Sequence, residues 1–166
     1  MSICLCTQYE TIEQEGRVKM VRTIGQLLQA KGSQIWSIEP EATVYRALQI
    51  MAEKNVGALL VIERDQLVGI FSERDYARKV ILKGKSSKGT SVSELMTPEV
   101  FYINTNATIE ECMALMTAKH IRHLPVLENK QLVGIVTLGD VVQQIIAEQK
   151  FTIRELEKYI TGGYER

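Results

Sequence analysis

The hydrophobic positions between residues 43 and 71 change from a helical period to a strand-like one. Thr43 has the side chain of a helix N-cap, and the apolar residues after it lie three or four positions apart. These residues are Val44, Ala47, Leu48 and Met51. Residues 58–62 and 66–71 are short β-rich runs divided by a polar turn. The pattern predicts one helix followed by a β-hairpin.

A strand and a second helix flank this segment. Residues 34–38 are a short extended stretch before the first helix. After the hairpin, Ser72 stands at the start of a helix, 73–82, which Gly84 ends. The predicted unit is therefore strand, helix, strand, strand and helix.

The same unit recurs 65 positions later. The sequence Gln-Leu-Val-Gly-Ile occupies residues 66–70 and again 131–135. Over 36–75 and 101–140, fourteen of forty aligned positions are identical. A long repeat at one fixed period indicates a duplicated supersecondary unit.

The second unit is expected to follow the first, element by element. Residues 101–104 are extended, Thr108 caps a helix, and 123–127 and 131–136 form a hairpin. The apolar face of this helix comprises Ile109, Cys112, Met113 and Met116. We expect Met51, Met113 and Met116 to be core residues and not ligands.

Both ends of the chain carry further helical patterns. Residues 18–30 have an apolar stripe that Gly32 closes, and Thr23 lies inside it as a candidate cap. A last helix is expected from Thr137 to about Thr161, with an interruption at 151–152. Its apolar stripe extends past its own repeat, so a second chain or the N-terminal helix is expected to cover it.

These patterns divide the chain into four parts. Residues 1–17 are a flexible extension, and 18–84 are the first repeat with its leading helix. Residues 85–98 are a linker with a short helical turn, and 99–161 are the second repeat with the long C-terminal helix.

Composition excludes several functions. Twenty basic side chains balance twenty acidic ones, so we expect no nucleic acid or membrane partner. No secretory signal is evident, and the odd cysteine count of three indicates a reducing, cytoplasmic location. Cys4 and Cys6 have no second Cys/His pair at ligand spacing, so no metal site is predicted.

Two hydroxyl–carboxylate pairs carry the candidate chemistry. Ser72 with Asp75, and Thr137 with Asp140, each stand where a strand ends and a helix begins. The i, i+3 spacing is that of a capping box, which is a purely structural role. The same position also offers helix N–H groups to a phosphate and a carboxylate to a ribose diol. The residues alone leave both roles open.

The repeats resemble a known family. Each copy closes with Gly, two hydrophobic residues, Ser or Thr, two further residues and Asp, which resembles the cystathionine β-synthase (CBS) domain. Two copies in tandem resemble a Bateman module. The segments 69–75, 121–126 and 159–162 are similar to small stand-alone bacterial CBS pairs. The resemblance covers about residues 20–160 and implies an α/β (α+β) fold, with two strand-helix-strand-strand-helix repeats packed as a pseudo-two-fold pair.

The family implies two nucleotide sites in a cleft between the repeats. In one, Asp140 and Thr137 hold ribose and phosphate. In the other, Asp75 and Ser72 do so, and Arg74 reaches a phosphate shared across the cleft. Residues expected to line the base or phosphate are Arg122, His123, Pro125, Ile103 and Ala107 in the second copy, and Gly57, Ala58 and Ile38 in the first.

The two copies differ chemically. Arg122, His123 and Pro125 stand where the first copy has Gly57, Ala58 and Leu60. Arginine and histidine suit a phosphate. The Asp140 site is therefore expected to bind phosphate better, and the ligand of the Asp75 site stays open.

The predicted function is a non-catalytic regulatory module that binds AMP, ADP, ATP or NAD(H), with no catalytic cofactor. No catalytic constellation is recognisable, so the chain is not expected to be an enzyme. The alternatives are a purely structural dimerisation module and an S-adenosylmethionine sensor. A homodimer is expected, together with a regulated protein partner that the sequence does not name.

Overall fold

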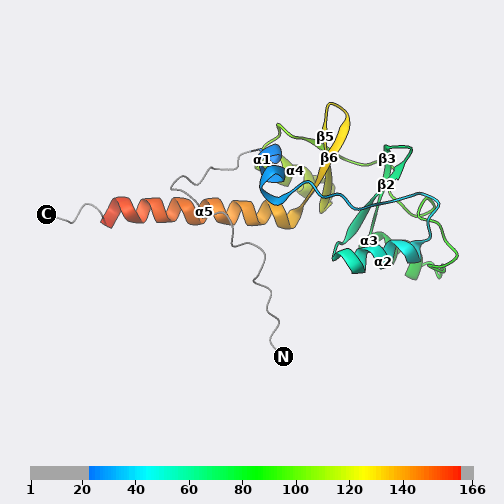
Figure 1. Cartoon of the computed structure of the whole chain (residues 1–166). Coiled ribbons are helices and arrows are strands. Elements are labelled where there is room, and N and C mark those ends of the chain that lie inside the picture. Colours follow the sequence, from blue (N-terminus) through cyan, green and yellow to red (C-terminus); the bar gives the residue numbers. More distant parts are fainter. Residues whose placement is uncertain (1–22, 162–166) are drawn as a thin grey trace.

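Each repeat forms a three-stranded sheet of the same topology (Figure 1). The computed structural model describes residues 23–161. In the first sheet, β1 (Ser37–Ile38) runs parallel to β2 (Ala58–Glu63), which pairs antiparallel with β3 (Gln66–Ser72). In the second, β4 (Ile103–Asn104), β5 (His123–Glu128) and β6 (Gln131–Thr137) pair in the same way. The predicted α/β fold of two duplicated units is confirmed.

The two hairpin turns have the same unusual backbone. Arg64 and Asp65 have φ of 48° and 63°, and Asn129 and Lys130 have φ of 49° and 66°. Two successive residues with positive φ match the right-handed twist of the strands they join. The polar turns expected from the sequence therefore form tight two-residue loops.

The first helices of the repeats begin and end alike. Thr43 Oγ1 accepts a hydrogen bond from the backbone N–H at the start of α2 (Val44–Lys54). Thr108 does the same for α4 (Ile109–Lys119), and Glu111 completes a capping box there. Both helices end at a left-handed residue, Asn55 or His120. The exposed His120 thus serves as a helix C-cap.

The helix expected over 73–82 is only partly α-helical. α3 (Glu73–Asp75) continues directly into a π-helical segment, η1 (Tyr76–Ile81). The wide turns accompany contacts from Lys79 to the linker, where its Nζ donates to Leu95 O at 2.8 Å. Such a contact is not encoded in the local periodicity. Gly84, with φ of 62°, ends the segment as expected.

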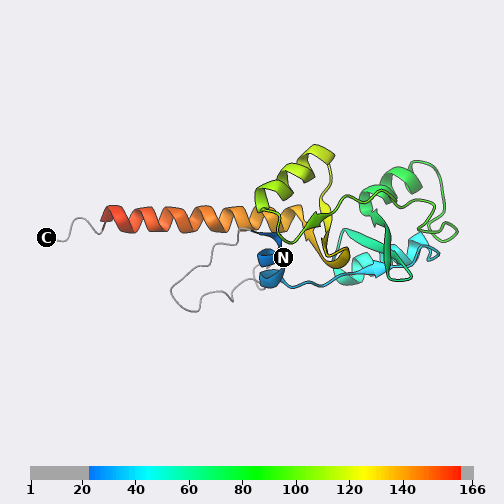
Figure 2. The same ribbon diagram turned by 90° about the horizontal axis from the view of Figure 1, so that it is seen from above.

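The last helix, α5 (Leu138–Thr161), is continuous. The predicted interruption at 151–152 is wrong, because Thr152 Oγ1 donates to Glu148 O at 3.0 Å and so satisfies its hydroxyl within the helix. Figures 1 and 2 show that the second half of α5 projects away from both repeats. No described helix meets the length and apolarity that a membrane span requires.

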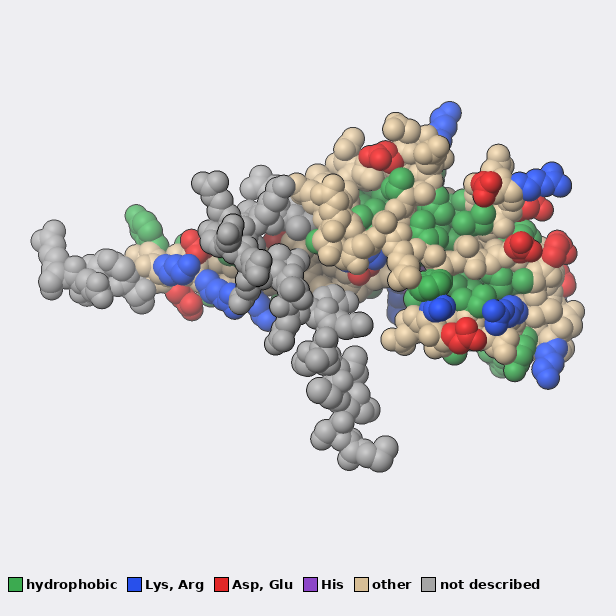
Figure 3. Space-filling model, viewed as in Figure 1, with side chains coloured by type: hydrophobic (Ala, Val, Ile, Leu, Met, Phe, Trp, Pro, Cys, Tyr) green, Lys and Arg blue, Asp and Glu red, His purple; other side chains and the backbone are tan. Residues whose placement is uncertain are grey.

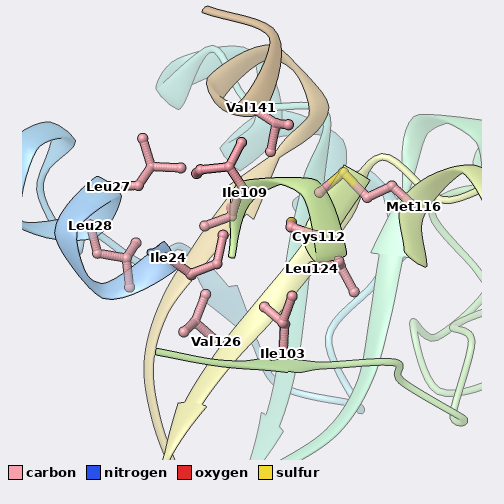
Figure 4. Packing of buried hydrophobic residues seen from close by; sticks show 11 residues of the cluster. Ile24, Leu27, Leu28, Ile103, Ile109, Cys112, Met116, Leu124, Val126 and Val141 are labelled. Atoms are coloured by element: carbon pink, nitrogen blue, oxygen red, sulfur yellow. The ribbon is translucent and has the colours of Figure 1, made fainter. Parts of the chain in front are cut away.

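The leading helix, α1 (Ile24–Lys31), packs against the second repeat and not against the first, which it precedes. Its residues Ile24, Leu27 and Leu28 lie in one buried cluster with β4, β5, α4 and α5 (Figure 4). Thr23 caps this helix with Gln26. The expected start near residue 18 lies outside the described residues, as do the 1–17 extension and Cys4 and Cys6.

The linker covers the first repeat in the same way. The backbone N–H of Ile24 donates to Ala107 O at 2.9 Å, and the N–H of Val92 donates to Ala42 O at 2.8 Å. Val92 and Leu95 are buried in the core of the first repeat. Each repeat is therefore completed by the segment that precedes the other repeat. The exact domain limits stay a prediction.

Of the three methionines predicted to lie in the core, two are buried. Met51 is 3% exposed and Met116 1% exposed, but Met113 is 37% exposed, so the core prediction for Met113 is wrong. On α4, the sheet-facing positions are Ile109, Cys112 and Met116. Met113 follows Cys112 by about 100° of helical rotation, which turns its side chain out of the core.

Candidate functional site

Thr137 and Asp140 form a capping box at the junction of β6 and α5. The N–H of Thr137 donates to Asp140 Oδ2 at 2.7 Å and its hydroxyl donates to the same oxygen at 2.8 Å, while Asp140 N–H donates back to Thr137 Oγ1 at 3.3 Å. The hydroxyl and carboxylate are thus fixed at the positive end of a 24-residue helix.

Lys31 approaches this carboxylate from the leading helix. Its Nζ lies 2.7 Å from Asp140 Oδ2, and the two side chains are 22% and 18% exposed. Within the described residues, the two hydrogen bonds from Thr137 and the ion pair with Lys31 all involve Oδ2. The other oxygen, Oδ1, is therefore available to a further donor.

The equivalent carboxylate of the first repeat is held on both oxygens. Ser72 N–H and Oγ donate to Asp75 Oδ2 at 3.1 and 2.6 Å. Lys79 Nζ lies 2.8 Å from Oδ1, and the Thr97 hydroxyl donates to the same atom at 3.4 Å. Asp75 has less capacity for a new ligand than Asp140 has, so the geometry favours the second repeat.

A hollow of about 430 Å³ opens beside the Thr137–Asp140 pair. Its lining comprises Arg122, His123, Thr137, Leu138, Gly139 and Val142. The volume lies within the range of about 300–1,000 Å³ usual for small-molecule sites. The backbone fixes this arrangement, because Leu138 N–H donates to Arg122 O at 2.9 Å. The structure therefore brings together the second-repeat residues expected to hold phosphate.

Arg74 joins the two repeats. Its Nη1 donates to the carbonyl of His120, the end of α4, at 2.7 Å. It lines a second hollow of about 210 Å³ together with Arg122. Two guanidinium groups from different repeats thus border one space. His123 also faces the first repeat, since a Cβ on Gly57 would lie 3.7 Å from its ring.

Burial and charge set the protonation of His123. Burial lowers the pKa of His123, the Arg122 charge lowers it further, and the Asp140 carboxylate partly offsets both. Arg122 is therefore the permanent cation of the site, and neutral His123 offers a single N–H donor. Burial also raises the pKa of the neighbouring Cys112 thiol to about 11, with a further contribution from Asp140.

The remaining predicted residues lie in the cores. Pro125 and Ala58 are buried within β5 and β2, and Ile103 and Ile38 are each 7% exposed. The carbonyl of Ala107 already accepts the bond from Ile24. None of these residues lines either hollow.

Sequence reasoning missed Lys31, Lys79 and Thr97. A signal for the first was present, because residues 23–28 match 91–96 in kind: a hydroxyl residue, a β-branched residue, a small residue, Gln or Glu, Leu, and Leu or Met. This additional short similarity, at an offset of 68 positions, marks the two segments that each pack on the repeat they do not precede directly. It would have placed the helix that carries Lys31.

A family model described as the CBS domain matches residues 32–81 and 92–147. The chain belongs to the CBS-domain family. It is 41% identical over 140 residues to the mitochondrial CBS domain-containing protein CBSX3 of Arabidopsis thaliana, covering 81% of this chain and 68% of the relative. The predicted tandem CBS pair is confirmed.

Solved structures agree with this assignment. A protein with CBS domains from Burkholderia ambifaria MC40-6 is 48% identical, with a TM-score of 0.75 over 76% of this chain and 96% of that one. The CBS domain pair of protein MJ0100, solved with 5′-methylthioadenosine and S-adenosyl-L-methionine, is 21% identical, with a TM-score of 0.65 over 76% and 97%. This second likeness concerns the fold alone.

The lowered pKa of His123 predicts acid sensitivity. As pH falls, the unfolded chain protonates this imidazole near its ordinary pKa of about 6.5, before the folded chain does. Stability is therefore lost as pH falls through that value toward the folded pKa. We expect His123→Gln to flatten the pH dependence of the free energy of unfolding in this window, measured by urea denaturation. Arg122→Gln should produce part of the same change, and an unaltered slope in His123→Gln would contradict the assignment.

Proposed function

We propose that this CBS pair is a regulatory module that binds an adenosine-containing nucleotide, AMP, ADP, ATP or NAD(H), at the second repeat. One observation carries the proposal. The Asp140 carboxylate, with Oδ1 available, is held by Thr137, and Thr137 lines the 430 Å³ hollow together with Arg122 and His123.

The chemistry of each group suits one part of a nucleotide. A carboxylate accepts two hydrogen bonds from the 2′- and 3′-hydroxyls of ribose, and Asp140 Oδ1 provides the open acceptor. The guanidinium of Arg122 matches the oxygens of a phosphate. Thr137 and the first N–H groups of α5 offer further donors to the same anion. Lys31 bonds to Oδ2, so a ribose bound at Oδ1 leaves this ion pair in place.

The fixed charge of the hollow distinguishes phosphate esters from S-adenosylmethionine. The latter carries a sulfonium cation, which Arg122 repels, whereas a nucleotide phosphate is attracted. The MJ0100 complex makes an adenosyl sulfonium the natural second ligand to test. We expect this chain to prefer the phosphate compounds.

The proposal also includes a homodimer and a weaker first site. Asp75 is held on both oxygens, so a nucleotide there must break its bond to Lys79. A regulatory role further requires that ligand binding favour one of two conformations. The Arg74–His120 contact between the repeats is the candidate element, because it borders the hollow that Arg122 shares.

Binding is tested by calorimetry and thermal unfolding with AMP, ATP, NADH and S-adenosylmethionine. A ligand at about 100 times its dissociation constant is expected to stabilise the folded protein by about 2.7 kcal/mol. If none of the four compounds produced heat of binding or stabilised the protein, the alternative of a purely structural dimerisation module would be favoured. A new product after prolonged incubation with ATP or NADH would favour an enzyme.

A further inference from the structure

The two pseudo-equivalent helices differ at the position four residues after the carboxylate. Lys79 follows Asp75 at this spacing, and Gln144 follows Asp140. Residues at i and i+4 lie on the same face of a helix, so this side chain is within reach of the carboxylate. Figure 3 shows acidic and basic side chains interspersed over the visible face of the first repeat. A difference between the two sites is therefore expected from single side chains and not from the general charge of a repeat.

The ammonium group of Lys79 covers the Oδ1 oxygen of Asp75. Its Nζ lies 2.8 Å from this oxygen, and it donates to Leu95 O at 2.8 Å and to Thr97 Oγ1 at 3.3 Å. Three acceptors match the three N–H bonds of an ammonium group. Thr97 is itself fixed, because its backbone exchanges two hydrogen bonds with Ile70 of β3. Lys79 is therefore held in place by the linker as well as by the carboxylate.

Gln144 points away from the carboxylate of its own repeat. Its Nε2 donates to Glu148 Oε1 at 3.2 Å, one turn further along α5. In the first repeat Lys83 stands at the position of Glu148, so Lys79 has a cation and not an acid four residues further on. The charge pattern thus directs the side chain back toward the carboxylate in the first repeat and away from it in the second. As a result, the Oδ1 oxygen is bonded in the first repeat and, within residues 23–161, available in the second.

We propose that Lys79 occupies the ribose-binding position of the first repeat as an internal cation and so restricts nucleotide binding to the second repeat. The inference rests on the proposed nucleotide site at Asp140. It assigns the choice between two similar sites to a single position, which holds lysine in one copy and glutamine in the other. A lysine there competes with the ribose hydroxyls for the same carboxylate oxygen, whereas a glutamine bonded to Glu148 does not.

The first test opens the site of the first repeat. In the wild type, isothermal titration calorimetry with AMP is expected to give one nucleotide per chain. Lys79→Gln removes the ammonium group, and its amide can still donate to Leu95 O, so the protein is expected to fold and to bind two. Adding Asp75→Ala to this variant should return the stoichiometry to one. Arg78→Gln makes the same change of charge at the neighbouring exposed position and is the matched control, with one AMP per chain.

The second test closes the site of the second repeat and leaves the existing contacts of its carboxylate in place. Gln144→Lys places an ammonium group four residues after Asp140, and an acid N-terminal to a lysine at this spacing is the favoured order in a helix. The affinity for AMP is expected to fall at least about tenfold, because the ribose must displace a charge-assisted hydrogen bond. The double variant Gln144→Lys/Glu148→Lys removes the competing acceptor and should lower the affinity further. Gln143→Lys adds the same charge at the preceding exposed position and should leave the affinity unchanged.

The outcomes separate this inference from the proposed function. If the wild type and Lys79→Gln both bind one AMP per chain, Lys79 does not close the first repeat, and the site at Asp140 survives. Two AMP per chain in the wild type, or an undiminished affinity in Gln144→Lys, would likewise overturn the inference. If the wild type binds no AMP and Lys79→Gln binds one, the role of Lys79 is supported and the proposed site at Asp140 is wrong. Absence of binding in both proteins would overturn both.

Discussion

Asp140→Ala is expected to abolish measurable binding of adenine nucleotides while the protein stays folded. The substitution removes the acceptor for both ribose hydroxyls, and hydrogen bonds to a charged group are each worth about 1.5–3 kcal/mol. Losing two of them weakens binding at least about 100-fold. Calorimetric titration with AMP and ATP measures the change, and Asp75→Ala should have a much smaller effect.

A matched control separates this role from helix capping. Glu111 caps α4 as Asp140 caps α5, since its Oε2 accepts from Thr108 N–H at 2.9 Å, but it is not bonded to Thr137, which lines the hollow. Glu111→Ala is therefore expected to cost a similar stability, about 1 kcal/mol, and to leave nucleotide affinity unchanged. Equal nucleotide affinities in Asp140→Ala and Glu111→Ala would show that the Thr137–Asp140 pair serves only as a helix cap.

Ile24→Ala should lower the free energy of unfolding by about 2–5 kcal/mol. Ile24 is fully buried in the core of the second repeat, although it precedes the first repeat in the chain. Its truncation leaves a cavity under α1 and loosens the helix that carries Lys31. Urea denaturation followed by circular dichroism measures the loss.

Hydrogen exchange locates the effect of this substitution. We expect amides of β4, β5 and α4 to lose protection before those of β1, β2 and α2, because α1 packs on the second repeat. Leu82→Ala, at a side chain that is 79% exposed, is the control and should change stability by less than about 0.5 kcal/mol. Loss of protection confined to the first repeat would contradict the packing of α1 on the second repeat.

The elements that sequence reasoning located are those whose causes are local. Thr43 and Thr108 cap helices through bonds to residues three positions on, and the polar turns at Arg64–Asp65 and Asn129–Lys130 close hairpins between neighbouring strands. The Thr137–Asp140 and Ser72–Asp75 pairs were visible for the same reason. Phe151 and Thr152 were misread because a helix tolerates a β-branched residue such as Thr152 when its hydroxyl bonds to the preceding turn.

The donors that bind the carboxylates of Asp140 and Asp75 could not be predicted from the sequence. Lys31 and Asp140 are 109 positions apart, and their contact depends on which repeat α1 covers. Lys79 lies within reach of Asp75 at i+4, yet only the packing of the linker brings Thr97 to the same oxygen. Tertiary packing therefore decides whether both oxygens of the carboxylate are bonded, as in Asp75, or only one, as in Asp140.

By itself the sequence determined the duplication, the order of elements in each repeat and the helix starts that carry the candidate chemistry, because periodicity and capping act over a few residues. Only the tertiary structure decided which preceding segment completes which repeat. Gly69 and Gly134 lie in the same five-residue sequence, so the two sheets offer nearly equal surfaces. Leu28 packs on Gly134 and Met96 on Gly69, where an added Cβ would meet them at 2.8 and 2.5 Å. A choice between two such similar surfaces is made by the path of the whole chain and not by local sequence.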